Sequence, residues 1–158
     1  MRLHSTDGVT FTLRPLRYEF PELAPTEPDD WDANWLVLRG ELHVPGHVPW
    51  SFEDPSLTTW DAAHLTRWLR RVASGQAAPG RHATLEFVEP DLAFSLAAVE
   101  AGLVTVRVHL ALEARPPWSP APDDDVLDPY AVDVTTTCAG LARAVEEWER
   151  EVAAFPVR

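Results

Sequence analysis

The chain has 158 residues, of which 46% are hydrophobic, and carries a net charge of −12 at pH 7. This length and apolar content suffice for one core, so we expect residues 1–158 to form a single domain. The charge argues against nucleic acid as a partner, because phosphate contacts require clustered Lys and Arg side chains. A strongly acidic surface favours a monomer, or at most a weak homodimer, that attracts a basic protein partner.

The cysteine content and the first residues of the chain bear on its compartment. Cys138 is the only cysteine, which excludes an intramolecular disulfide and a zinc site built on several thiolates. Residues 1–8 lack the apolar segment and the cleavage site of a signal peptide. No apolar run approaches the roughly 20 residues needed to cross a bilayer. We therefore expect a cytoplasmic protein that makes no membrane contact.

Alternating apolar and polar residues predict strands in the first part of the chain. Residues 9–13 alternate in this way after the turn signal Thr6-Asp7-Gly8. Residues 35–44 have one fully apolar face and one mixed face when they are read as a strand. A loop rich in proline and carboxylates precedes this second strand. A short strand at residues 50–52 is expected to follow it.

Two segments have the periodicity of amphipathic helices. Thr58 is a hydroxyl N-cap ahead of apolar residues that share one helix face, and Gly75 is a C-terminal stop, which predicts a helix over about residues 59–73. A second stripe, at steps of four and three, predicts a helix over about residues 138–154. This stripe consists of Leu141, Val145, Trp148, Val152 and Phe155.

Further strands are expected between the two helices. Residues 84–88, 92–98 and 103–113 predict an antiparallel meander, followed by an acidic, proline-rich loop and a last strand at residues 130–134. Together these elements predict an α+β fold, with a mainly antiparallel β-sheet of about six to eight strands and two amphipathic helices packed on it. We find no internal repeat in the sequence.

The sequence contains no motif with a defined chemistry. His43 and His47 are close in sequence, but two imidazoles across a Pro-Gly turn do not make a metal site. Cys138 lies at the expected start of the second helix without a charged base beside it, so we expect a structural thiol. A nucleophile elbow, a phosphate loop and a dinucleotide fingerprint are all missing. We therefore expect no catalytic residue, no metal ligand, no cofactor and no enzymatic activity.

Two acidic stretches that each contain a tryptophan are the candidate partner-binding segments. Runs of carboxylates usually form solvated loops, and the spacing of a calcium-binding loop is missing. Aromatic residues set among charges, however, are enriched at the energetic centres of protein interfaces. The candidate partner-binding residues are Asp29, Asp30, Trp31, Asp32, Trp118, Asp123, Asp124 and Asp125.

Four segments follow one another in a characteristic order. They are residues 18–21 (Tyr-Glu-Phe-Pro), 31–38 (Trp-Asp-Ala-Asn-Trp-Leu-Val-Leu), 57–61 (Leu-Thr-Thr-Trp-Asp) with Arg-Trp-Leu at 67–69, and 85–94 (Leu-Glu-Phe-Val-Glu-Pro-Asp-Leu-Ala-Phe). In order and character they resemble the WapI-type immunity proteins of bacteria over most of the chain. The resemblance implies an antidote to the C-terminal nuclease domain of a WapA-like toxin. It implies no binding residues, because such antidotes recognise their own toxins through surfaces that vary.

The favoured hypothesis is a non-enzymatic immunity protein that neutralises a basic toxin domain by direct binding through an acidic surface containing aromatic residues. A nuclease domain must attract phosphates, so an inhibitor gains by presenting negative charge. The alternative is a small-ligand-binding or enzymatic domain that uses the sheet face, which requires a deep pocket with convergent polar groups. A self-associating structural protein is a third possibility.

Overall fold

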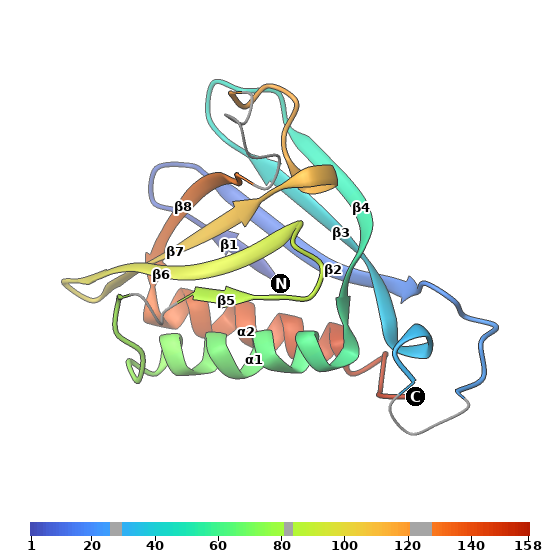
Figure 1. The fold of residues 1–158 in the computed structure, drawn as a ribbon. Coiled ribbons are helices and arrows are strands. Elements are labelled where there is room, and N and C mark those ends of the chain that lie inside the picture. The colour runs from blue at the N-terminus through green and yellow to red at the C-terminus, as the bar shows by residue number, and fades with distance from the viewer. Residues whose placement is uncertain (26–29, 81–83, 121–127) are drawn as a thin grey trace.

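Eight strands form two antiparallel sheets in the computed structural model, which describes residues 1–25, 30–80, 84–120 and 128–158. The first sheet contains β1 (Arg2–His4), β2 (Thr10–Tyr18), β3 (Trp35–His43) and β4 (Trp50–Thr58), in this order. The second contains β5 (Thr84–Glu86), β6 (Leu92–Glu100), β7 (Leu103–Leu110) and β8 (Tyr130–Thr137). Helices α1 (Thr59–Ala73) and α2 (Cys138–Val152) lie side by side beneath the two sheets (Figure 1). The predicted α+β class is confirmed.

The strands of the first sheet follow the alternation of apolar and polar residues. In β3, Leu36 and Leu38 are fully buried, whereas Arg39 is half-buried and His43 is exposed. The strand β4 extends to Thr58, well beyond the predicted residues 50–52. Pro55 does not interrupt it, because β4 is an edge strand, where proline is tolerated.

The two halves of the chain have the same order of elements. Each consists of a four-stranded antiparallel meander followed by a helix of 15 residues. Each helix begins directly after the last strand at a threonine N-cap, which is Thr58 for α1 and Thr137 for α2. The repeat is one of topology, and the residues that fill the two halves differ enough to hide it in the sequence.

The helix termini agree closely with the prediction. The helix α1 spans the predicted residues 59–73 and begins with a capping box, in which the Asp61 N–H donates to Thr58 Oγ1 and the Thr58 N–H donates to Asp61 Oδ2, both at 3.1 Å. The helix α2 ends at Val152 rather than at the predicted residue 154. The chain turns there, and the Phe155 ring packs edge-on against Tyr18 with the ring centroids 5.5 Å apart.

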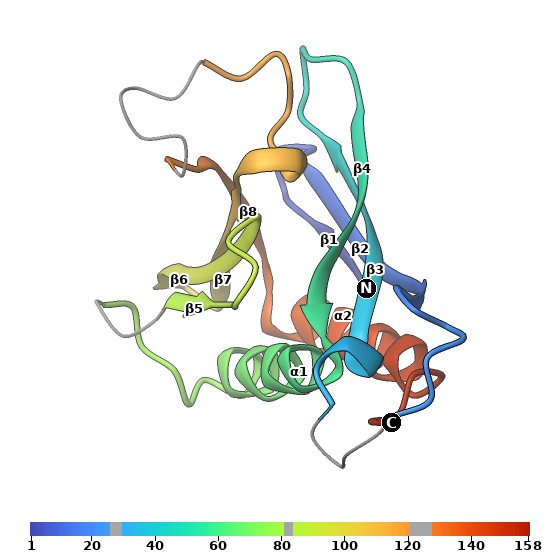
Figure 2. The same ribbon diagram turned by 45° about the vertical axis from the view of Figure 1, so that its right-hand side comes forward.

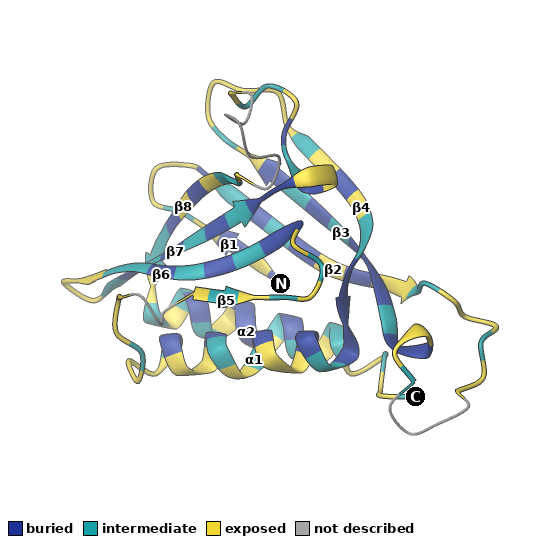
Figure 3. Cartoon of the chain, in the orientation of Figure 1, coloured by how far each residue is buried: buried dark blue, intermediate teal, exposed yellow. Residues whose placement is uncertain are grey.

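One continuous hydrophobic core joins both sheets and both helices. Phe11 of β2 meets Phe94 of β6 edge-on, with the ring centroids 6.2 Å apart. Trp148 of α2 is fully buried, and its indole Nε1 donates to the Ala62 carbonyl of α1 at 3.3 Å. A sheet with one apolar face is stable only when that face is shielded from water. Here the apolar face of each sheet packs against that of the other. Buried and exposed residues therefore alternate along the strands (Figure 3).

The two sheets are connected differently along their two sides. On one side β1 lies next to β8, where the Thr6 N–H donates to the Thr135 carbonyl and the Thr135 N–H donates to Ser5 Oγ, both at 3.1 Å. On the other side β4 faces the 3-10 helix η2 (Leu112–Ala114), which follows β7 (Figure 2). Trp50 Nε1 of β4 donates to the Ala114 carbonyl at 3.1 Å.

Within the described ranges, no helix is long and apolar enough to cross a membrane.

Candidate functional site

The connection between β2 and β3 carries two exposed aromatic side chains among carboxylates. Phe20 is 45% exposed and Trp31 is 49% exposed. A shallow hollow of about 540 Å³ is lined by Glu19, Phe20, Pro21, Glu22, Leu23 and Asp32. The pKa of Glu19 is raised, mainly by desolvation and further by the negative charges of Asp54 and Asp32. This hollow therefore combines apolar surface with clustered negative charge.

The buried side chain of Asn34 holds the part of this connection that directly precedes β3. Its Nδ2 donates to the Asp30 carbonyl at 2.8 Å, and its Oδ1 accepts from Thr59 Oγ1 of α1 and from the Arg158 backbone N–H, both at 2.9 Å. The Arg158 guanidinium donates to the carbonyls of residues 20 and 21 at 3.2 and 3.0 Å. Because a buried amide whose hydrogen bonds are satisfied fixes its surroundings, Trp31 is presented from a fixed segment before β3, and Arg158 fixes the backbone at Phe20.

Trp118, the other predicted aromatic contact, lies at the opposite end of the molecule. It is half-buried, its Nε1 donates to the Val48 carbonyl at 3.0 Å, and its ring stacks on His47 with the centroids 4.2 Å apart. Trp31 lies shortly before β3, whereas Trp118 contacts His47 and Val48 after it, so the length of this nine-residue strand, roughly 30 Å, lies between the two tryptophans.

The structure thus brings together only some of the predicted partner-binding residues. Asp30, Trp31 and Asp32 lie with Phe20 at one end of β3, and Trp118 lies apart from them. The remaining candidates, Asp29, Asp123, Asp124 and Asp125, lie outside the described residues.

A second group of carboxylates lies where β4 meets the second sheet, and we call Asp54, Glu89, Asp91 and Glu113 the acidic seam. Asp54 belongs to β4, Glu89 and Asp91 precede β6, and Glu113 belongs to η2. The pKa of Asp54 is raised, first by desolvation and then by the charges of Glu113 and Glu89. The four side chains therefore form one electrostatically connected cluster, which comes from three separate parts of the sequence.

Asp91 is the fully buried member of the acidic seam. Its Oδ2 lies 2.5 Å from Ser56 Oγ, which also lies 3.2 Å from the Asp54 carbonyl oxygen, and its Oδ1 has no hydrogen-bond partner among the described residues. Desolvation raises the pKa of Asp91 to about 7, opposed by the bond with Ser56 and reinforced by the other three carboxylates. Because a serine hydroxyl donates only one proton, both contacts of Ser56 are satisfied together only when Asp91 is protonated and donates to Ser56.

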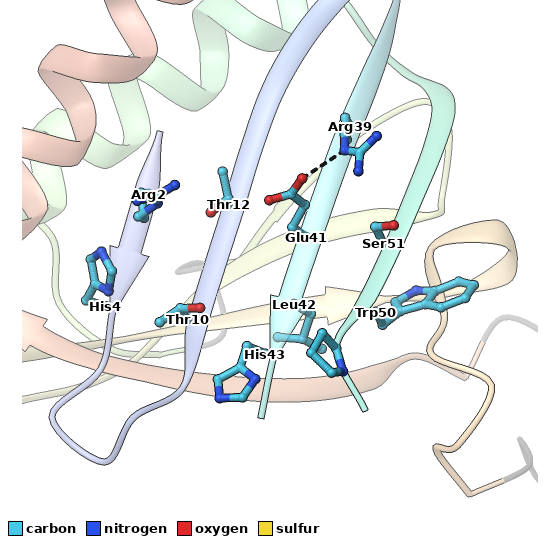
Figure 4. Close-up of a pocket in the computed structure, with 11 residues that line it drawn as sticks. Arg2, His4, Thr10, Thr12, Arg39, Glu41, Leu42, His43, Trp50 and Ser51 are labelled. Carbon is cyan, nitrogen blue, oxygen red and sulfur yellow. Dashed lines mark hydrogen bonds and ion pairs between the residues drawn. The ribbon is translucent and has the colours of Figure 1, made fainter. Parts of the chain in front are cut away.

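The outer face of the first sheet has a separate hollow of about 410 Å³ (Figure 4). Residues that line it include His4, Thr10, Arg39 and His43, which stand side by side on adjacent strands rather than around a common point. Arg39 Nε donates to Glu41 Oε1 at 2.8 Å and thereby lowers the pKa of that carboxyl. This hollow therefore lacks the convergent polar groups that the enzymatic alternative requires.

The histidine and cysteine candidates for metal or thiol chemistry have ordinary surroundings. Where the structure describes side chains, no three His, Cys, Asp or Glu residues are grouped so that they could hold a metal ion. His47 stacks on Trp118. Cys138 is the first residue of α2 and is half-buried.

A comparison with protein families matches nearly the whole chain. The model of the WapI-like immunity protein family covers residues 2–156. The chain belongs to this family. A search of curated proteins and a search of solved structures each return no match. Membership in the WapI-like family supports an immunity role, implies a toxin as the partner in general terms and favours a non-enzymatic action.

Sequence reasoning missed most of the residues that this WapI-like chain gathers along β4. Asp54, Asp91 and Glu113 are far apart in sequence and carry no shared motif, so no local signal joins them. Phe20 could have been found, because it lies in the Tyr-Glu-Phe-Pro segment that carries the family resemblance. Asn34 lies between two tryptophans in another of these segments, and only its burial shows that it positions the loop.

Proposed function

We propose that this WapI-like immunity protein neutralises a basic toxin domain, such as a nuclease domain, by direct stoichiometric binding in the cytoplasm. The proposed contact surface is centred on Asp30, Trp31 and Asp32, with Phe20 beside them. The other proposed contacts are Asp29, Trp118, Asp123, Asp124 and Asp125. The protein acts without catalysis, as a monomer or weak homodimer, and does not contact nucleic acid or membrane.

The observation that carries this proposal is the pair of exposed aromatic rings among carboxylates. Phe20 and Trp31 are each nearly half exposed; Arg158 bonds to the carbonyl of Phe20, and Asn34 bonds to the carbonyl of Asp30 next to Trp31. Burial of such rings against a partner gains free energy, and aromatic residues dominate the energetic centres of interfaces. The neighbouring carboxylates of Glu19 and Asp32 favour the approach of a cationic surface, which a nuclease domain needs for its own phosphate contacts.

Co-expression with each toxin domain encoded next to the gene tests the proposal. The wild-type chain should protect the cells. The variant Phe20→Ala/Trp31→Ala should protect poorly and bind the toxin at least about 30-fold more weakly, because the loss of even one aromatic anchor at an interface centre costs about 2 kcal/mol. Val99→Ala is the matched control, since Val99 is also 44% exposed but lies on β6. This control should protect as well as the wild type.

Titration of the purified toxin separates stoichiometric binding from catalysis. Inhibition should become complete at an equimolar amount of the immunity protein, and the mass of the toxin should be unchanged after its release. Killing that is equally fast with and without this chain, for each neighbouring toxin domain, would contradict the proposal. Full inhibition at a small fraction of the equimolar amount would contradict its non-enzymatic part.

A further inference from the structure

The turn after β7 holds Glu113 against the edge of β4. Leu112 in η2 has a φ of +46°, a left-handed conformation that bulky residues rarely adopt. The Ala111 N–H donates to the Asp91 carbonyl at 2.9 Å, and Trp50 Nε1 anchors the other end of η2. Backbone strain of this kind persists where the surroundings enforce it, and it is concentrated at functional sites. Asp91, η2 and β4 are therefore held in one fixed arrangement.

Among the described residues, the carboxylates of the acidic seam form no ion pair, whereas other carboxylates on the sheets, such as Glu53 and Asp133, do. Glu53, the neighbour of Asp54 on β4, accepts from Arg39 Nη1 at 2.9 Å. Asp133 on β8 accepts two hydrogen bonds from Arg107, at 2.7 and 2.9 Å. None of the four carboxylates of the acidic seam forms an ion pair within the part of the chain that the structure describes.

The buried Oδ1 oxygen of Asp91 is a second observation at the acidic seam. Asp91 Oδ1 is buried and receives no hydrogen bond from any described residue. A buried acceptor without a donor costs free energy, and such groups in folded proteins call for an explanation. The bond between Asp91 Oδ2 and Ser56 places this carboxyl against β4, two positions from Asp54. The carboxyl that carries the unsatisfied atom therefore belongs to the same cluster as Asp54, Glu89 and Glu113.

We infer that the acidic seam is the docking point for a guanidinium group of the toxin, an arginine side chain held by Asp54, Glu89 and Glu113 next to Asp91. This inference rests on the proposed function and adds the chemical group that is recognised. A guanidinium carries five N–H donors in a planar fork and pairs with carboxylates on more than one edge. Glu113 is exposed, Asp54 and Glu89 are half-buried, and β4 is an edge strand, so the partner has access.

Docking of a cation next to Asp91 removes the proton of that carboxyl. A nearby positive charge favours the ionised form, so the proton passes to solvent and Ser56 turns its hydroxyl from the Asp54 carbonyl to Asp91. Among the described residues, the charged groups that act on Asp91 are Asp54 on β4, Glu89 in the segment before β6, and Glu113 in η2. Removal of the proton from Asp91 costs less free energy at higher pH. Binding of the guanidinium group therefore strengthens as the pH rises from 6 to 8.

Calorimetric titration of the full chain with a hexa-arginine peptide tests the inference. The variant Asp54→Asn/Glu113→Gln should bind about tenfold more weakly than the wild type. The control Glu100→Gln/Glu146→Gln removes the same charge at two exposed positions elsewhere and should bind within about threefold of the wild type. Glu113→Gln alone, at an exposed position that cannot disturb the core, should weaken binding about threefold. Hexalysine should bind the wild type about fivefold more weakly than hexa-arginine.

The outcomes separate this inference from the proposed function. Equal losses for the seam and control variants, or equal binding of the two peptides, would overturn the inference while leaving protection against the toxin intact. Failure to neutralise any neighbouring toxin would overturn the proposed function, whatever the peptide titrations show. In Asp91→Asn the strengthening of hexa-arginine binding between pH 6 and 8 should vanish. A pH dependence that survives in this variant would overturn the role of Asp91.

Discussion

The aromatic ring of Phe52 fills the space that a side chain on Gly40 would need. The two residues are opposite each other in the β3–β4 pair, and both are buried. A Cβ atom on residue 40 would lie 2.1 Å from Phe52 Cε1 and 2.2 Å from Phe52 Cζ. Glycine is thus required at position 40, because the ring packs directly on its backbone. An aromatic ring that covers a glycine on the neighbouring strand is a known arrangement in β-sheets.

Replacement of Gly40 with alanine should destabilise the fold by about 1–3 kcal/mol, because the Phe52 ring has to leave its position in a packed core. Urea denaturation measures this free energy of unfolding. The double variant Gly40→Ala/Phe52→Leu should lose less than the sum of the two single losses, since leucine vacates the ring position. Additive losses would show that the two side chains do not compete for the same space.

The variant Asp91→Asn should gain stability relative to the wild type as the pH rises. The pKa of Asp91 is about 7 in the folded protein, above the ordinary value of 3.8, so folding favours the protonated form and this residue weakens the fold progressively from about pH 4 to pH 7. Asparagine mimics the protonated carboxyl and carries no such penalty. The stability difference between the variant and the wild type should grow by about 2–3 kcal/mol between pH 5 and pH 8.

Urea denaturation of both proteins at the two pH values measures this difference. A difference between variant and wild type that does not change with pH would show that Asp91 is ionised in the folded protein throughout that range.

Removal of the Thr58 hydroxyl should cost about 1–2 kcal/mol of folding free energy, because Thr58→Ala breaks the buried capping box with Asp61. Thr58→Ser keeps the oxygen and should stay within about 0.5 kcal/mol of the wild type. Thr137→Ala is the matched variant on α2, where Thr137 Oγ1 accepts a single exposed bond from the Gly140 N–H at 2.9 Å, and it should cost less. Equal losses at the two caps, measured in urea, would contradict the difference in burial.

The whole chain should unfold in one cooperative transition, as expected for a single domain over residues 1–158. The two halves share one core, in which Phe11 contacts Phe94 and Trp148 bonds to Ala62. Neither half can bury its apolar sheet face alone. Differential scanning calorimetry should therefore give equal calorimetric and van't Hoff enthalpies. Two resolved transitions would instead assign the two meanders to separate folding units.

The helices and most strands could be predicted because their signals are local. A threonine cap and an apolar stripe define α1 within a single stretch of sequence, and period-two alternation defines β3 and β7. The prediction missed the length of β4, because Pro55 usually ends a strand and only its place at a sheet edge explains its tolerance. It also missed the repeat of the meander-helix unit, which lies in the order of elements rather than in the residues.

The sequence by itself determined the class of the fold, the two helices and the strongly acidic character of the surface. It also carried the resemblance that the family comparison confirmed. Only the tertiary structure decided that Trp31 and Trp118 lie at opposite ends of β3, and that Asp91 bonds to Ser56 within electrostatic reach of Asp54 and Glu113. Secondary structure follows from side chains within a few residues of one another, whereas the burial and charge of a site depend on segments that meet only after the two sheets have packed.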